Sequence, residues 1–141
     1  MKKLIAILLI SPFMFAEEIN LACETYSTFE WETKSSKTSI GSTSLIIDTA
    51  KKIVSMNGGA TPYKENGNKI IWTNFSQLDI GDETGMAWSY YLDRVSRELE
   101  IHFATQKFNN GFQGDIQKYK LENYKLGLIH SAKCEKVEVL F

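Results

Sequence analysis

Two histidines, His102 and His130, are the side chains best suited to acid–base chemistry or metal binding near neutral pH. Neither has a second histidine or a cysteine at the spacing of a metal site. Alternation along residues 98–103 places His102 on the solvent face beside Glu100, and His130 lies near the expected last turn. Both are therefore interpreted as exposed polar residues, with a metal ligand or an acid–base residue as the alternative.

Other local signatures of chemistry are also missing from the sequence. The chain contains no Gly-x-Ser-x-Gly elbow, no His-Glu-x-x-His pair, no phosphate-binding glycine loop and no dinucleotide fingerprint. Asp79, Asp82 and Glu83 form an acidic cluster that could hold calcium, but they lack the alternating spacing of a calcium loop, and a solvated loop is favoured. We expect no catalytic residue, no metal site and no cofactor, although a triad that meets only in space stays open.

The two cysteines, Cys23 and Cys134, lie near the two ends of the chain. An even cysteine count in an exported protein predicts a disulfide, which here would close a loop of about 110 residues and bring the two ends side by side. On the chain-entropy model such a bridge stabilises by about 4 to 5 kcal/mol at most. A metal pair or a redox pair is disfavoured because Cys-x-x-Cys spacing is absent.

Residues 1–16 have the three parts of an export signal. Two lysines at the start precede an apolar run from Leu4 to Phe15, and the small Ala16 stands before an acidic pair. The run is too short to span a bilayer, so cleavage near Ala16 is predicted and a retained anchor is the alternative. Lipidation of Cys23 is a further alternative. The mature protein is expected to be periplasmic or secreted, with no stable membrane span.

The charge of the chain argues against two classes of partner. Its formal net charge of −1 becomes −3 once the two lysines of the signal are removed. Such a surface provides no electrostatic footprint for nucleic acid or for anionic lipid. Residues 17–141 carry no linker composition and are long enough to bury one core, so a single domain is predicted.

Short apolar segments separated by turn residues predict an all-β fold, a small antiparallel sheet curled into a barrel, lipocalin-like or similar. The clearest hairpin runs from Trp88 to Phe103 and turns at Asp93, with Leu99, Ile101 and Phe103 facing the core. A hairpin of similar design joins 45–47 to 53–56, with a turn that differs in length by one residue. Further strands are expected at 24–33, 69–74, 116–121, 124–129 and 133–141, the last with Val137, Val139 and Phe141 on one face.

These elements together resemble a loose group of small exported bacterial β-domain proteins. The resemblance rests on Cys23, an Ile-Asp-turn-Lys-x-Val hairpin (47–54), an Ile-x-Trp strand (70–72), a Leu-Asp-Arg-x-Ser hairpin (92–96) and the segment from Cys134 to Phe141. It implies a compact antiparallel β domain and no catalytic residue. The sequence departs from the group at Arg97 and Glu98, where such turns often carry glycine.

Aromatic residues are the richest feature of the sequence, and large rings suit both strands and the filling of a small core. Core filling is favoured over the lining of a ligand pocket. The predicted function is an exported, non-enzymatic binding or interaction domain whose partner is an unknown protein or a small apolar ligand. A lipocalin-like carrier and an inhibitor of a cell-wall hydrolase are the alternatives, and the chain lacks the Ser-x-x-Gly-x-x-Tyr loop expected for the inhibitor.

Overall fold

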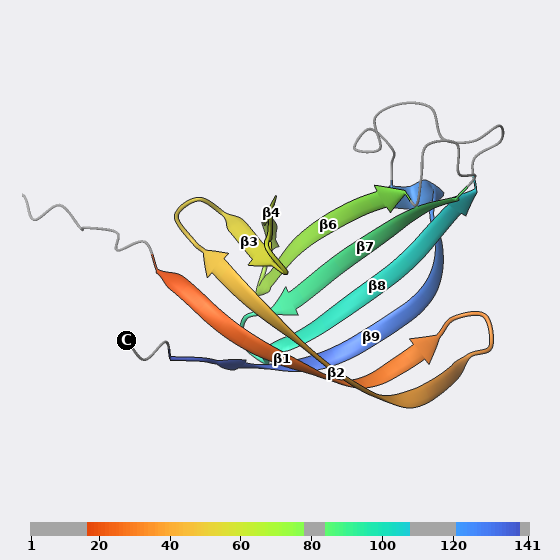
Figure 1. The fold of residues 1–141 in the computed structure, drawn as a ribbon, viewed down its shortest axis with the longest axis horizontal. Coiled ribbons are helices and arrows are strands. Elements are labelled where there is room, and N and C mark those ends of the chain that lie inside the picture. Colours follow the sequence, from red (N-terminus) through yellow and green to blue (C-terminus); the bar gives the residue numbers. More distant parts are fainter. Residues whose placement is uncertain (1–16, 78–83, 108–120, 139–141) are drawn as a thin grey trace, which may run out of the picture.

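A computed structural model of the chain describes residues 17–77, 84–107 and 121–138 (Figure 1). Within these residues the chain forms nine strands and one short 3₁₀ helix. They are β1 (Glu18–Glu30), β2 (Ser35–Asp48), β3 (Ile53–Met56), β4 (Gly59–Pro62), β5 (Lys64–Asn66), β6 (Lys69–Gln77), β7 (Thr84–Asp93), β8 (Glu98–Lys107), η2 (Leu121–Asn123) and β9 (Lys125–Lys136). The predicted all-β fold is confirmed.

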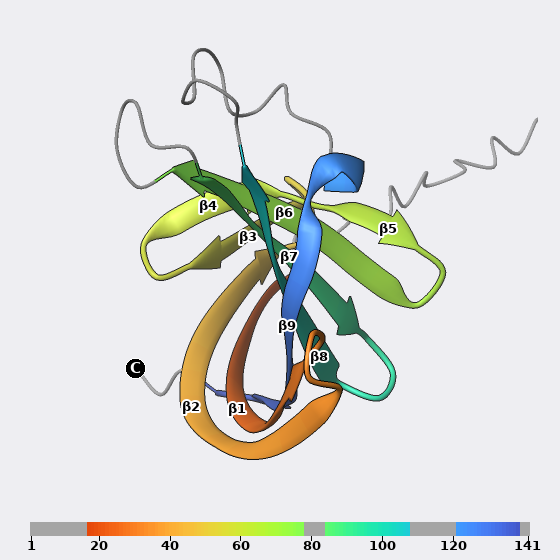
Figure 2. The same ribbon diagram turned by 90° about the vertical axis from the view of Figure 1, so that its right-hand side faces the viewer.

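All strands belong to one antiparallel sheet in the order β4-β3-β2-β1-β9-β8-β7-β6-β5. Apart from β4 and β5, which form the two edges, strands that follow one another in the chain pair with each other, as in an up-and-down barrel, and β1 also pairs with β9. The sheet curls so far that its two edge strands come together (Figure 2). The turns 49–52, 67–68 and 94–97 lie at one end of this barrel, which we call the turn end.

A single stretch of chain, residues 59–66, nearly closes the barrel. Its first half, β4, pairs with β3, and its second half, β5, pairs with β6 on the other side. The change of partner falls at Tyr63, a buried residue whose backbone N–H donates to the carbonyl of Lys52. Because β4 and β5 are consecutive, this bridging strand connects the two edges of the sheet.

The predicted disulfide is present between Cys23 and Cys134. The two residues are directly opposed partners on β1 and β9, and both are buried. The bridge therefore joins the first and last strands of the meander inside the core.

The core fills the half of the barrel nearest the turn end. Its buried members include Leu45, Ile70, Leu92 and Leu99, with the disulfide beside them. A second, smaller cluster lies on the outer face of the sheet, where Tyr124 covers Ala87, Ala104 and the partly buried Phe75. Because this cluster covers the outer face of β7 while the core covers its inner face, β7 has buried residues on both faces and no simple alternation of buried and exposed residues.

The hairpin of β7 and β8 has the predicted register and faces. Leu99 is fully buried, Ile101 packs against the core, and Glu98 and Glu100 are exposed. Phe103 is only half-buried, because the β8–β9 pairing shifts register directly after it.

The two turns that begin with aspartate have the same length, contrary to the predicted difference of one residue. Asp48 pairs with Ile53, and Asp93 stands five residues before its partner Glu98 in the same way. Each carboxylate caps backbone N–H groups of its own turn, and these hydrogen bonds hold the pKa values of Asp48 and Asp93 below their ordinary range.

Three strand predictions need correction. β1 begins at Glu18 rather than residue 24, since its early residues pair with the end of β2. The two strands expected at 124–129 and 133–141 are one continuous strand, β9, because β1 and β8 hold the intervening residues on both sides. Val137 follows that strand and is 45% exposed, so it does not share a core face. The expected strand 116–121 and residues Val139 and Phe141 lie outside the described residues, except for Leu121 in η2.

Candidate functional site

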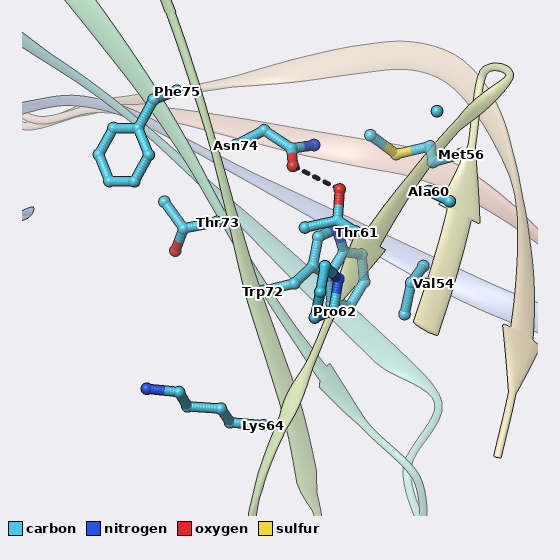
Figure 3. A pocket seen from close by; sticks show the side chains of 11 residues that line it. Val54, Met56, Ala60, Thr61, Pro62, Lys64, Trp72, Thr73, Asn74 and Phe75 are labelled. Carbon is cyan, nitrogen blue, oxygen red and sulfur yellow. Dashed lines mark hydrogen bonds between the residues drawn. The ribbon is translucent and has the colours of Figure 1, made fainter. Parts of the chain in front are cut away.

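A cleft of about 790 Å³ opens at the seam of the barrel, where β3 and β4 face β6. We call it the seam cleft (Figure 3). The described residues that line it are Val54, Met56, Gly59, Ala60, Thr61, Pro62, Lys64, Trp72, Thr73, Asn74 and Phe75. It exists because β5 pairs with β6 only at residues 69–71, so β4 and the rest of β6 are not joined by a sheet ladder.

A polar contact crosses the seam at one point. The Thr61 hydroxyl donates a hydrogen bond of 2.7 Å to the side-chain oxygen of Asn74. Asn74 also hydrogen-bonds the hydroxyl of Tyr90, whose pKa is raised by burial in spite of that bond. Asn74 therefore connects the edge strand β4 to the interior of the barrel.

The inner wall of the seam cleft is rigid and aromatic. Trp72 is 2% exposed, and its ring stacks on that of Tyr90 with centroids 4.9 Å apart and planes 3° apart. Such a stacked pair adds packing energy beyond the area that it buries. Val54 and Met56 extend the apolar wall along β3.

The lining residues lie on both faces of β6. In Figure 3, Thr73 and Phe75 project on one side of this strand, while Trp72 and Asn74 project on the side of β4. A ligand in the cleft would therefore contact the edge of β6 itself. Lys64 is the one ionisable side chain among the described lining residues.

The structure separates the two histidines. His102 lies on the outer face of β8, where its Nε2 is 3.2 Å from the Glu100 carboxylate and its ring contacts that of Tyr91. His130 occupies the next strand, β9, with Ile101 as its partner. Adjacent strands thus carry the two rings on opposite faces.

His130 is not near a turn and is not exposed, which corrects the sequence-based interpretation. It lies within β9 on the face of the disulfide, and its Nδ1 is 2.7 Å from the Thr28 hydroxyl. Burial lowers the pKa of this imidazole below its ordinary value of 6.5. The ring is therefore a partly buried residue of the inner face with a hydroxyl partner.

The remaining candidates for chemistry form no site in the part of the chain that the structure describes. Asp79, Asp82 and Glu83 lie outside that part. Among residues 17–77, 84–107 and 121–138, no group of three or more histidine, cysteine or acidic side chains is arranged to hold a metal ion. The same residues include no helix that is both long and apolar enough to cross a membrane.

The aromatic residues divide between the core and the surface. Trp72, Tyr63, Tyr90 and Tyr124 are buried, as predicted. Trp31 and Tyr26 are exposed, and the ammonium of Lys34 lies 3.5 Å above the ring of Trp31. Tyr119 lies outside the described residues.

Sequence reasoning missed the seam cleft because it missed the bridging strand, treating the ends of residues 57–68 only as turns. One signal was available there: Pro62 between two polar clusters marks an edge strand, since proline cannot donate to a ladder. Comparison with protein-family models, curated proteins and solved structures finds no match to this chain.

Proposed function

We propose that this protein is an exported, non-enzymatic binding domain that holds an extended segment of a partner protein in the seam cleft. The observation that carries the proposal is the pair of strand edges on either side of the cleft. β4 has a sheet partner only in β3, and residues 72–77 of β6 have one only in β7. Within the described chain, both strands therefore present backbone groups toward the seam.

An extended peptide suits such edges because its own N–H and C=O groups can continue a ladder, while alternate side chains enter pockets beside it. The seam cleft supplies both kinds of contact. Trp72, Val54 and Met56 form an apolar wall, and the amide of Asn74 and the hydroxyl of Thr61 are polar groups at its centre. Mixed walls of this kind are typical of sites that bind by hydrogen bonds and burial together.

The packing of the barrel disfavours the lipocalin-like carrier. Such a carrier needs a hollow interior, whereas the stacked rings of Trp72 and Tyr90 occupy the middle of this barrel above the core of the turn end. An inhibitor of a cell-wall hydrolase remains one form that the interaction domain could take, since it too would bind a protein surface.

The chemistry of the cleft supports a non-enzymatic role. Its described lining holds no carboxylate, imidazole or thiol, and the hydroxyl of Thr61 is engaged by the Asn74 side chain rather than by a base. The disulfide supports an oxidising compartment outside the cytoplasm, as the export signal does.

The proposal is tested by site-specific photo-crosslinking on the full chain, in cells that export it. A photoreactive phenylalanine analogue replaces Ala60, an exposed residue of the cleft, and in a matched control it replaces Glu100, an exposed residue of β8. We expect a discrete polypeptide adduct from position 60 alone. Equal adducts from both positions, or none from position 60, would contradict the proposal.

A further inference from the structure

A second, smaller pocket lies at the turn end, away from the seam cleft. It measures about 150 Å³ and is lined by four aliphatic and four charged residues, which are Ile19, Leu21, Ile47, Leu92, Asp93, Arg94, Arg97 and Lys136. The aliphatic side chains belong to the ends of β1, β2 and β7, and the charged ones to the 94–97 turn and the last residues of β7 and β9. We call it the turn-end pocket.

Three of the four charged side chains, those of Asp93, Arg94 and Lys136, already have hydrogen-bond or ion-pair partners. Asp93 accepts the backbone N–H groups of Val95 and Ser96 at 2.8 and 2.9 Å. Arg94 donates to the carbonyl of Gly67 at 2.8 Å and lies 3.4 Å from the Glu65 carboxylate.

The remaining cations differ in their pairing. Lys136 has the Glu17 carboxylate 3.2 Å away. The guanidinium of Arg97 has no hydrogen-bond or ion-pair partner among residues 17–77, 84–107 and 121–138. Arg97 is therefore the one cation at this rim that lacks an ion-pair partner among the described residues.

The backbone of Arg97 is in the left-handed region, with φ of 60°. Residues other than glycine rarely adopt this backbone conformation, and it lowers the stability of the folded protein. Two lysines have similar φ values, but each uses its ammonium within the fold: Lys34 (φ 53°) lies over Trp31, and Lys52 (φ 55°) pairs with Glu65. Arg97 is the member of this set whose charge is unused and whose side chain lines a pocket.

We propose that the turn-end pocket binds a carboxylate that carries a compact aliphatic group. The aliphatic group would lie on Ile19, Leu21 and Ile47, and the carboxylate would accept the paired N–H groups of Arg97, whose fork matches its two oxygens. The volume corresponds to roughly five water molecules, so the ligand must be small. A free short-chain acid and the C-terminal residue of a peptide share this chemistry.

The two sources are distinguished by titration followed by two-dimensional amide NMR on the full-length mature protein. The probes are hexanoate, hexanol as its uncharged control, a tripeptide that ends in leucine with a free carboxylate, and the same tripeptide as its amide. If the amide signals of residues 19–21, 47 and 92–97 shift with hexanoate and with none of the other probes, the ligand is a free acid. Shifts for the free-carboxylate tripeptide, larger than for its amide, assign a peptide terminus.

Arg97→Gly is the decisive variant because it removes the guanidinium while relieving the backbone. We expect a melting temperature at or above that of the wild type. The affinity for whichever carboxylate probe binds, hexanoate or the free-carboxylate tripeptide, should be at least tenfold weaker. Lys52→Gly is the matched control, with the same backbone relief at the equivalent turn and unchanged affinity.

Unchanged acid affinity in Arg97→Gly, or equal shifts with hexanoate and hexanol, would overturn the inference. Ala60→Arg, which blocks the seam cleft, should leave acid binding intact, so failure of this site and failure of the proposed function are separate results.

Discussion

The two halves of the barrel are built from the same strands but packed differently. Near the turn end, Ile70 of β6, Leu92 of β7 and Leu99 of β8 are each 2% exposed or less. Farther along the same strands, their equivalents Asn74 and Trp88 are only half-buried. The register is continuous along β6 and β7, so a change in the pairing of these two strands does not cause the difference.

This comparison indicates that the two halves of the barrel have different roles. The turn-end half holds the disulfide and the main core, and these contribute most of the stability. The other half can then keep open strand edges and a cleft at the seam. Sites that bind partners are often positioned in this way by a rigid scaffold that is stabilised elsewhere.

Trp72→Ala should give the largest loss of stability. This ring is buried and stacked, so its removal leaves a cavity, and we expect about 3 to 5 kcal/mol by chemical denaturation. Trp31→Ala is the matched control at an exposed ring, and it should cost less than about 1 kcal/mol through its contact with Lys34. Similar losses for the two variants would contradict the placement of the core.

Replacing both Cys23 and Cys134 by alanine should cost roughly 3 to 4 kcal/mol, because the bridge restricts a long loop of the unfolded chain. Circular dichroism at low temperature should still report the full strand content. Loss of the sheet in that variant would show that the core of the turn end cannot form without the bridge.

Three positions on β8 test the difference in burial within a single strand. Leu99→Ala should cost about 3 kcal/mol, since the residue is fully buried. Phe103→Ala should cost clearly less despite the larger side chain, because Phe103 is half-buried, with its ring centroid 4.5 Å from that of Trp88. His102→Ala should stay within about 0.5 kcal/mol. Denaturation midpoints of the three variants rank them, and a larger loss at Phe103 than at Leu99 would reverse the comparison.

The smallest effect is a pH dependence from His130. Burial lowers its pKa in the folded protein, so the unfolded chain binds more protons once the pH falls below about 6.5. The stabilising contribution of neutral His130 is therefore fully present above about pH 6.5. It is lost as the pH falls from there through the lower pKa of the folded protein. His130→Gln should therefore reduce the change in melting temperature between pH 7.5 and 5, measured by thermal denaturation at each pH, and an unchanged pH profile would contradict the burial of this imidazole.

The sequence predicted what local patterns determine. The faces of Leu99 and Glu100 follow from alternation within one strand, and the pairing of Cys23 with Cys134 follows from their number and position. The same reasoning failed where neighbours decide the structure. Ser131 resembles a turn residue, yet it lies in β9 because strands pair on both sides of it.

The candidate site was beyond sequence reasoning for a related reason. The seam cleft depends on the bridging strand, residues 59–66, which includes several residues of weak strand propensity, among them Gly59, Ala60 and Pro62. Its pairings with β3 and β6 are two-residue hairpins at residues 57–58 and 67–68, but the approach of β4 to the rest of β6 depends on the curvature of the whole sheet. A cleft between strands that are close only after the barrel curls leaves no local pattern in the chain.

The most direct test of the account is native mass spectrometry of wild-type protein and of Ala60→Arg, each purified from the cells that produce it. We predict that wild-type protein carries a bound polypeptide, and that Ala60→Arg, which fills the seam cleft at an exposed position, is folded and free of it. A small apolar molecule bound equally to both proteins, or a polypeptide retained by Ala60→Arg, would contradict the account.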